Sequence, residues 1–194
     1  NAEIVELLEQ ADAKAAGEDT SSGQADKEKE AELAEAAYSN DLQTMERLLK
    51  GGTSANARDD EGRPALYLAA WKGHLDALKL LRKHGANLEA TGPTGHTALI
   101  TATGNGKHEC VEFLLGAGAD KDATDKYGGT ALHIAVVNGH IGCARLLVAA
   151  GADRTKNNGF GKTALDLARE RGHAGIAALL EQADAAAAPE EAGA

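Results

Sequence analysis

Apolar positions in the middle of the chain follow two short helical patterns, separated by polar turns. Small apolar residues lie on one side of a first predicted helix at Leu66, Ala69 and Ala70, and Gly73 can end that helix. Leucines at three-residue steps predict a second helix, namely Leu75, Leu78 and Leu81. The polar stretch that follows, ANLEATGPTG, is rich in turn residues and predicts a hairpin-like loop. The pattern therefore predicts two antiparallel helices followed by a loop.

This helix-helix-loop pattern repeats every 33 residues. The short motif that opens each first helix occurs as GRPAL, GHTAL, GGTAL and GKTAL, starting at Gly62, Gly95, Gly128 and Gly161. Alanine keeps the same period in the first helices, and leucine keeps it in the second helices. Five units are in frame, at residues 29–57, 58–90, 91–123, 124–156 and 157–183. A fixed period of this length indicates a stack of repeats whose core is continuous between neighbours.

The fourth unit resembles an ankyrin repeat. It reads Gly128-Gly-Thr-Ala-Leu-His-Ile-Ala135, followed by Asn138-Gly-His140, Leu146-Leu147 and Gly151-Ala-Asp153. The resemblance covers residues 31–182 and implies an all-α ankyrin-repeat solenoid of paired antiparallel helices with hairpin-like loops. The units depart from the family pattern in three ways. Alanine replaces the usual proline in the opening motif, Pro64 replaces the threonine in the second unit, and only the fourth unit keeps the motif histidine, at His133.

The two ends of the chain share the sequence LLEQADA. Residues 1–12 resemble the second helix of a preceding unit that lacks its first helix, so we expect an isolated helix and a fragment of a longer ankyrin-repeat protein. From their composition, we expect residues 13–28 to form a flexible linker or an extended loop and residues 184–194 to form a disordered tail. The linker could continue one stack or join two arrays, and residues 1–12 could instead dock on the exposed end of the array at 29–183.

The net charge of −10 comes mainly from the two ends. Residues 1–30 carry nine acidic and three basic side chains, and residues 184–194 carry three acidic side chains and no basic one, which leaves −1 for residues 31–183. Nucleic-acid binding is disfavoured because it needs a clustered basic face. The sequence has no apolar run of about 20 residues, so no membrane insertion is expected. No signal peptide is evident at the start of the chain.

Two short motifs are similar to catalytic or ligand-binding motifs, but the repeat pattern explains both of them better. Gly159-Phe-Gly-Lys-Thr163 lacks the first glycine of a phosphate loop, and His108-Glu-Cys-Val-Glu112 lacks the second histidine of a zinc-protease helix. Cys110 and Cys143 lie 33 residues apart on adjacent second helices, too far for a disulfide, so we expect free thiols and a reducing compartment. We therefore expect no enzymatic activity, no metal site and no cofactor.

The resemblance implies that the array binds another protein on a concave face formed by hairpin tips and first helices. Of six aromatic residues, Phe113 falls in a core column, whereas Tyr38 and Trp71 share one surface column and Tyr127 and Phe160 share another. Aromatic residues are over-represented among interface hot spots, although each could instead cover a neighbouring unit. The polar candidates on the same surface are Glu61, Arg63, Lys72, His96, Asn105, Lys126, Asn138, Lys162 and Arg171.

The predicted function is therefore a protein–protein interaction module, a non-catalytic adaptor or scaffold. We expect a cytoplasmic or nuclear monomer. The alternative is an architectural spacer of a large multi-ankyrin protein whose activity lies in a missing enzyme or channel domain. Asn56 resembles the asparagines that are hydroxylated in some ankyrin proteins. We also expect Leu114→Ala to destabilise the fold clearly and Trp71→Ala hardly at all.

Overall fold

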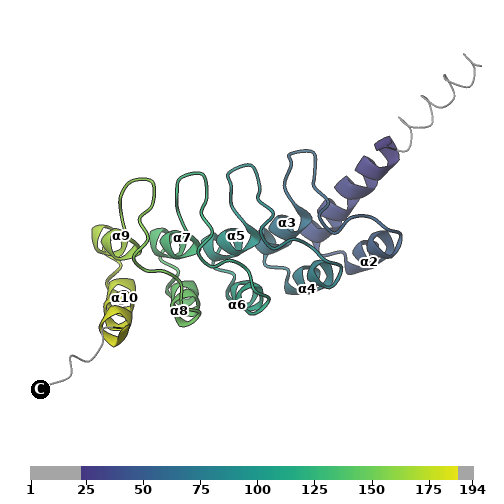
Figure 1. Ribbon diagram of the computed structural model, residues 1–194. Coiled ribbons are helices and arrows are strands. Elements are labelled where there is room, and N and C mark those ends of the chain that lie inside the picture. The colour runs from purple at the N-terminus through teal and green to yellow at the C-terminus, as the bar shows by residue number, and fades with distance from the viewer. Residues whose placement is uncertain (1–22, 188–194) are drawn as a thin grey trace, which may run out of the picture.

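The computed structural model describes residues 23–187, which form five helix pairs stacked in chain order (Figure 1). The first helices of the pairs are residues 23–39, α3 (Ala65–Lys72), α5 (Ala98–Gly104), α7 (Ala131–Val137) and α9 (Ala164–Glu170). The second helices are α2 (Leu42–Lys50), α4 (Leu75–Lys83), α6 (His108–Gly116), α8 (Ile141–Ala149) and α10 (Ala174–Ala187). The described residues contain helices and no strand, so the predicted all-α solenoid is confirmed.

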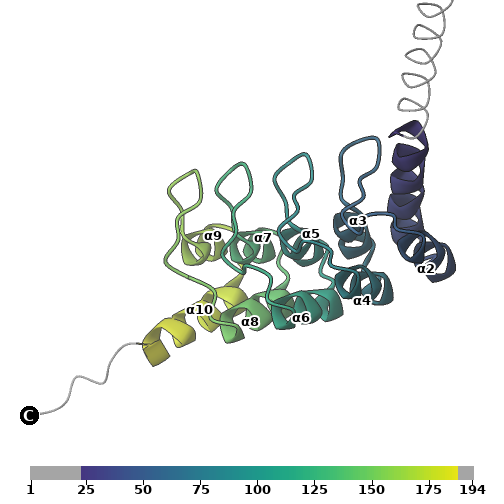
Figure 2. The same ribbon diagram turned by 45° about the vertical axis from the view of Figure 1, so that its right-hand side comes forward.

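The helices form two layers, and the loops project from one of them. Figure 2 shows α3, α5, α7 and α9 in one row, α4, α6, α8 and α10 in a second row, and four hairpin-like loops that rise beside the first helices. Isolated bridges between Arg58 and Pro64 and between Thr124 and Thr130 close the bases of two of these loops. The loop tips and the first helices therefore share one face of the molecule.

Threonine side chains begin three of the first helices. Thr97, Thr130 and Thr163 each accept a hydrogen bond from the backbone N–H three residues later. Such caps satisfy backbone donors that have no partner inside the helix. Pro64 makes no side-chain cap, and α3 starts there with an extended residue at its N-cap position. The departure from the family pattern at Pro64 thus changes the local hydrogen bonding and leaves the helix in place.

The core lies between the layers and continues from one unit to the next. The alanines of the first helices are completely buried, as Ala69, Ala102 and Ala135 show. Their small side chains let adjacent first helices approach closely. Leucines of the second helices fill the seam, and Leu81, Leu114 and Leu147 have no exposed surface. Phe113, which the sequence placed in a core column, is half-buried and packs against this core at its edge.

Two boundaries differ from the sequence-based ones. Residues 23–28 are helical and continue into the first helix of the array, and residues 184–187 belong to α10. The remaining predictions for the ends, on residues 1–12, on residues 13–22 of the linker and on residues 188–194 of the tail, lie outside the described residues.

Both cysteines are buried free thiols, as predicted. Burial raises the pKa of Cys110 to about 11 and also raises the pKa of Cys143. A thiol with a raised pKa carries little thiolate at neutral pH and is a poor nucleophile.

Candidate functional site

The hairpin tips are joined to one another by backbone hydrogen bonds. The Gly159 N–H donates to the Tyr127 carbonyl oxygen at 2.7 Å, and the Lys126 N–H donates to the Thr94 carbonyl oxygen at 3.3 Å. A Cβ atom on Gly159 would lie 2.6 Å from the Tyr127 oxygen, so only glycine permits this contact. The row of tips is therefore held in one arrangement before any partner arrives.

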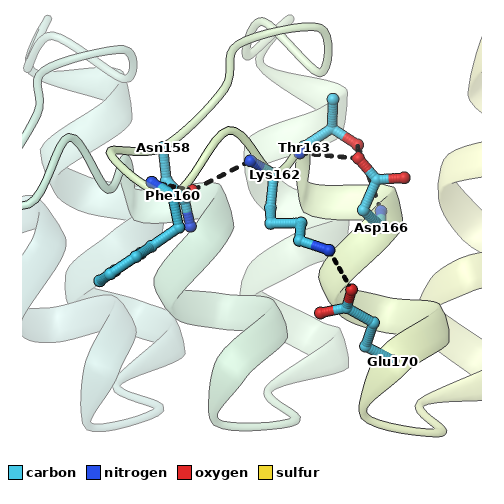
Figure 3. A network of polar contacts seen from close by, with 6 residues as sticks. All are labelled: Asn158, Phe160, Lys162, Thr163, Asp166 and Glu170. Carbon is cyan, nitrogen blue, oxygen red and sulfur yellow. Dashed lines mark hydrogen bonds and ion pairs between the residues drawn. The ribbon is translucent and has the colours of Figure 1, made fainter.

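Within a tip, one side-chain oxygen orients the residues that follow it. Asp125 Oδ1 accepts from the backbone N–H groups of Tyr127 and Gly129, each at 2.8 Å. Asn158 Oδ1 accepts in the same way from Phe160 at 2.9 Å and from Lys162 at 3.1 Å, as Figure 3 shows. These bonds close the loop beneath each aromatic residue. The Tyr127 and Phe160 side chains consequently project from the tips into solvent.

An apolar groove lies between these two aromatic side chains. Tyr127 is 64% exposed and Phe160 is 76% exposed, which are the highest values among the large hydrophobic residues of the described chain. The groove has a volume of about 310 Å³. We call it the clamp groove; its lining residues are Asp125, Tyr127, Gly129, His133, Ile134, Val137, Asn158, Phe160 and Leu167. The groove therefore offers an apolar surface that a partner side chain can cover.

His133 fixes the position of one wall of the clamp groove. Its ring is buried, its Nδ1 atom accepts from the backbone N–H of Thr130, and its Nε2 atom donates to the Lys162 carbonyl oxygen at 3.1 Å. The second bond joins α7 to the loop of the next unit. Burial lowers the pKa of His133, so the ring is neutral at neutral pH. This histidine is a structural link between two units.

Lys162 and Glu170 form an ion pair in the fifth unit, near the clamp groove. The Lys162 ammonium pairs with the Glu170 carboxylate, and Figure 3 shows this pair beside the Thr163 and Asp166 cap of α9. The hydrogen bond to Glu170 raises the pKa of Lys162. Both partners are exposed, so the pair contributes little to stability and remains available to a partner protein.

A second aromatic cluster lies at the other end of the described face. The Trp71 ring makes edge contacts with Tyr38 and Tyr67, each with ring centroids 6.2 Å apart. The Arg63 guanidinium carbon lies 5.8 Å from the Trp71 ring, and the Lys72 ammonium lies 4.2 Å from the Tyr38 ring. Trp71 is 37% exposed. This cluster covers the junction of the first two units, which is the alternative role that the sequence left open for these aromatic residues.

Between the two ends lies a smaller cavity of about 250 Å³. We call it the asparagine well; its lining residues are Tyr67, Trp71, His96, Ile100, Thr101, Gly104, Asn105, Ile134 and Asn138. Ile134 also lines the clamp groove, so the two hollows are adjacent. The face formed by the loop tips and first helices therefore has two neighbouring hollows of different chemistry.

The structure brings some of the predicted site residues together and separates others. Trp71, His96, Asn105 and Asn138 meet in the asparagine well, and Tyr127 and Phe160 flank the clamp groove. Tyr38 and Lys72 belong to the aromatic cluster. Glu61 pairs with Arg63 at 2.7 Å. Two further predicted cations are exposed, Lys126 at a tip and Arg171 at the end of α9.

The Asn56 side chain is part of a repeated bond between units. Its Oδ1 atom accepts from the backbone N–H of Asn87 at 2.8 Å, and Glu89 and Asp122 make the corresponding bonds one and two units later. The residue is exposed. This repeated bond explains why each of these units has a side-chain oxygen at this position. Hydroxylation of Asn56 remains a prediction.

Sequence reasoning missed eleven of the residues that line the two hollows. They are Tyr67, Ile100, Thr101, Gly104, Asp125, Gly129, His133, Ile134, Val137, Asn158 and Leu167. A signal was present in the repeat columns. The position that holds Trp71 is glycine, valine and glutamate in the next three units, and the position that holds Tyr67 is isoleucine, histidine and aspartate. The Trp71 column lies at the surface, and variation at such a column marks positions that a partner can select, whereas Ile100 and His133 of the Tyr67 column are buried.

The chain belongs to the ankyrin-repeat family. A family model described as ankyrin repeats (3 copies) matches residues 33–125 and 105–188. A search of curated proteins found no significant match. In residues 23–187 no helix is long and apolar enough to cross a membrane. The same residues hold no group of three or more His, Cys, Asp or Glu side chains that is suited to a metal ion.

Proposed function

We propose that this protein is a recognition module that binds a partner protein on the concave face, with the clamp groove as its main contact. Ankyrin repeats generally mediate protein–protein interaction. The observation that carries the proposal is the pair of highly exposed aromatic side chains, Tyr127 and Phe160, on either side of an apolar groove. Scattered surface apolar residues are ordinary, but a paired arrangement over an apolar floor is typical of a binding site.

The backbone of the tips supports the same proposal. Ordering a loop on binding opposes association, so a surface that is already ordered binds more tightly. The Gly159–Tyr127 backbone bond and the side chains of Asp125 and Asn158 order the two tips in the free protein. Aromatic side chains at such centres are hot spots, each of which contributes about 2 kcal/mol or more to binding.

The mechanism that we propose is shape and hot-spot complementarity, without a cofactor or a covalent step. We infer a non-catalytic monomeric adaptor or scaffold that acts in the cytoplasm or the nucleus. The buried free thiols of Cys110 and Cys143 support a reducing compartment. Asn56 is a candidate for hydroxylation because it is exposed on a loop. A mass increase of one oxygen on the peptide that contains Asn56 tests this modification.

A quantitative affinity capture with three forms of the protein tests the function. The forms are the native chain, a variant with Tyr127→Ala and Phe160→Ala, and a control with Ile141→Ala. Ile141 is a suitable control because it is 41% exposed and lies on the second-helix layer. We expect the native chain and the control to retain a partner that the double variant loses, with all three unfolding at similar temperatures.

Two other outcomes contradict the proposal. A partner that the double variant still retains places the contact elsewhere on the molecule. No specific partner for any form favours the architectural spacer, in which the repeats only separate other parts of a larger protein.

A further inference from the structure

Two asparagine side chains in the asparagine well have fixed orientations. Asn105 Nδ2 donates to the Thr101 carbonyl oxygen at 2.8 Å, and Asn138 Nδ2 donates to the Gly104 carbonyl oxygen at 3.0 Å. Because both nitrogens are held by the last turn of α5, the Oδ1 atoms are the ends left for a ligand. Neither Oδ1 atom accepts a hydrogen bond from any residue in 23–187. The well therefore presents two acceptor oxygens close to the end of one helix.

A buried hydroxyl in the same well also has no partner. Thr101 is 4% exposed, and its Oγ1 atom makes no hydrogen bond within the described part of the chain. The second, fourth and fifth units carry Leu68, Ile134 and Leu167 at this repeat position, and the first unit carries the exposed Glu35. A buried hydroxyl without a partner destabilises the free protein, so its presence at a position that is apolar in both neighbouring units needs an explanation. A polar ligand group in the well would supply one.

The remaining surfaces of the well suit a flat side chain with an apolar stem. Trp71 and Tyr67 form an aromatic wall, and Ile100 and Ile134 add apolar surface. No lysine, arginine, aspartate or glutamate lines the well. The Arg63 guanidinium carbon lies 5.8 Å from the Trp71 ring centroid, within the range of a cation–π contact.

The charges around the well favour a cation. The Arg63 charge is balanced by Asp59 at 2.6 Å and by Glu61 at 2.7 Å. Residues 58–63 together carry three carboxylates and two guanidinium groups. The buried Asp125 carboxylate lies 3.4 Å from Nε2 of His96, which lines the well. The hairpin at residues 58–63 therefore has a net negative charge, and a further carboxylate contacts a lining residue of the well.

We propose that the asparagine well binds the side chain of an arginine from the partner protein. The guanidinium donates N–H bonds to Oδ1 of Asn105 and Asn138, and its aliphatic stem packs on Ile134. Arginine fits better than lysine because its donors form a planar fork that also stacks on an aromatic ring. An apolar partner residue close to this arginine occupies the adjacent clamp groove. This inference rests on the proposed function, which supplies the partner.

A small probe tests the well without a partner. The chain has one tryptophan, so its fluorescence reports on Trp71 alone. We expect N-acetyl-arginine-N-methylamide to give a saturable change in this fluorescence and in the side-chain NH₂ resonances of Asn105 and Asn138. The citrulline and lysine amides, which lack the charge or the planar fork, should bind roughly tenfold more weakly. No response to the arginine amide, or an equal response to all three, overturns the proposal.

Substitutions at Asn105 separate binding from folding. Asn105→Lys places in the third unit the residue that the second unit carries at the same repeat position, Lys72, so the fold should tolerate it. Its charge should abolish binding of the arginine amide. Asn157→Leu is a control on an exposed loop residue outside the well and should change nothing. Arginine-amide binding that survives Asn105→Lys contradicts the proposal.

Selection from a phage library of random linear 12-residue peptides distinguishes this inference from the proposed function. The library is selected on the native chain and counter-selected on the variant with Tyr127→Ala and Phe160→Ala. We expect recovered peptides to share an arginine at a constant spacing from an apolar residue. If the recovered peptides bind the native chain but not the double variant and show no preference for arginine, the inference about the asparagine well is wrong and the proposed function stands. If no peptide depends on the clamp, the proposed function fails, and the arginine-amide titration still decides the chemistry of the well.

Discussion

The face formed by the loop tips and first helices has aromatic residues at both ends, and the two groups differ in their contacts within the fold. Trp71 touches Tyr38 and Tyr67 and has a guanidinium beside its ring, so much of its surface is already used within the fold. Tyr127 and Phe160 make no ring contact within the described residues, and each is more than half exposed. The first group stabilises a junction between units and also lines the asparagine well, and the second leaves most of its surface exposed. The same residue type therefore serves two roles on one face.

Leu114→Ala should give the largest loss of stability. Leu114 is fully buried between neighbouring units, so its truncation removes apolar contact and leaves a cavity. We expect the free energy of unfolding to fall by about 3 kcal/mol. Urea unfolding followed by circular dichroism measures this change and sets the scale for both aromatic groups. A change below about 1 kcal/mol would show that units pack far more loosely than the buried leucines indicate.

Trp71→Ala should destabilise the protein by an intermediate amount. The sequence suggested almost no effect, but the edge contacts with Tyr38 and Tyr67 change that expectation. Each aromatic pair contributes about 0.5–1.5 kcal/mol, so we expect a loss of about 1–2 kcal/mol. The same urea titration measures it. If Phe160→Ala costs as much as Trp71→Ala, the two groups do not differ and the comparison is wrong.

Lowering the pH should weaken the link between the fourth and fifth units. Burial lowers the pKa of His133 below its ordinary value of 6.5, so the unfolded chain binds a proton more readily than the folded chain. The contribution of His133 to the free energy of unfolding is complete above about pH 6.5. It falls as the pH drops through that value and stops changing below the lowered pKa of the folded state.

Thermal unfolding from about pH 7.5 to about pH 5.5 measures this contribution, because it spans the ordinary histidine pKa. His133→Gln is the control, since glutamine has no group that titrates in this range. We expect the native chain to lose more stability than the variant as the pH falls. Equal slopes for the two proteins would mean that the buried ring is not a link that responds to protonation.

Phe160→Ala should have the smallest effect on stability. The side chain is 76% exposed, so its removal should change the free energy of unfolding by less than about 0.5 kcal/mol. Its effect should appear in partner or peptide binding instead. Isothermal calorimetry with a peptide selected on the native chain measures that loss. A stability loss similar to that of Leu114→Ala would place Phe160 in the core and remove the basis for the clamp groove.

The fold was predictable because its signals are local and repeated. Gly128 to Ala135 and its counterparts specify the first helix, and leucines at three-residue steps specify the second. Because five units follow the same pattern in frame, each supports the prediction for the others, and all five are helix pairs in the structure. The boundary at residues 23–28 was less predictable because polar helices lack a periodic apolar face. The candidate site was predicted in part: Tyr127, Phe160, Asn105 and Asn138 were named, but the hollows they line were not.

Spacing within one unit was enough to predict the repeat length, the helix pairs and the columns that lie on the face of the loop tips and first helices. Which aromatic residues are covered and which are free follows instead from packing between units. That outcome depends on side chains one unit away, as when Trp71 meets Tyr38, or when the absence of a Cβ on Gly159 lets its backbone reach Tyr127. Contacts between units set these positions, and no spacing within a unit encodes them.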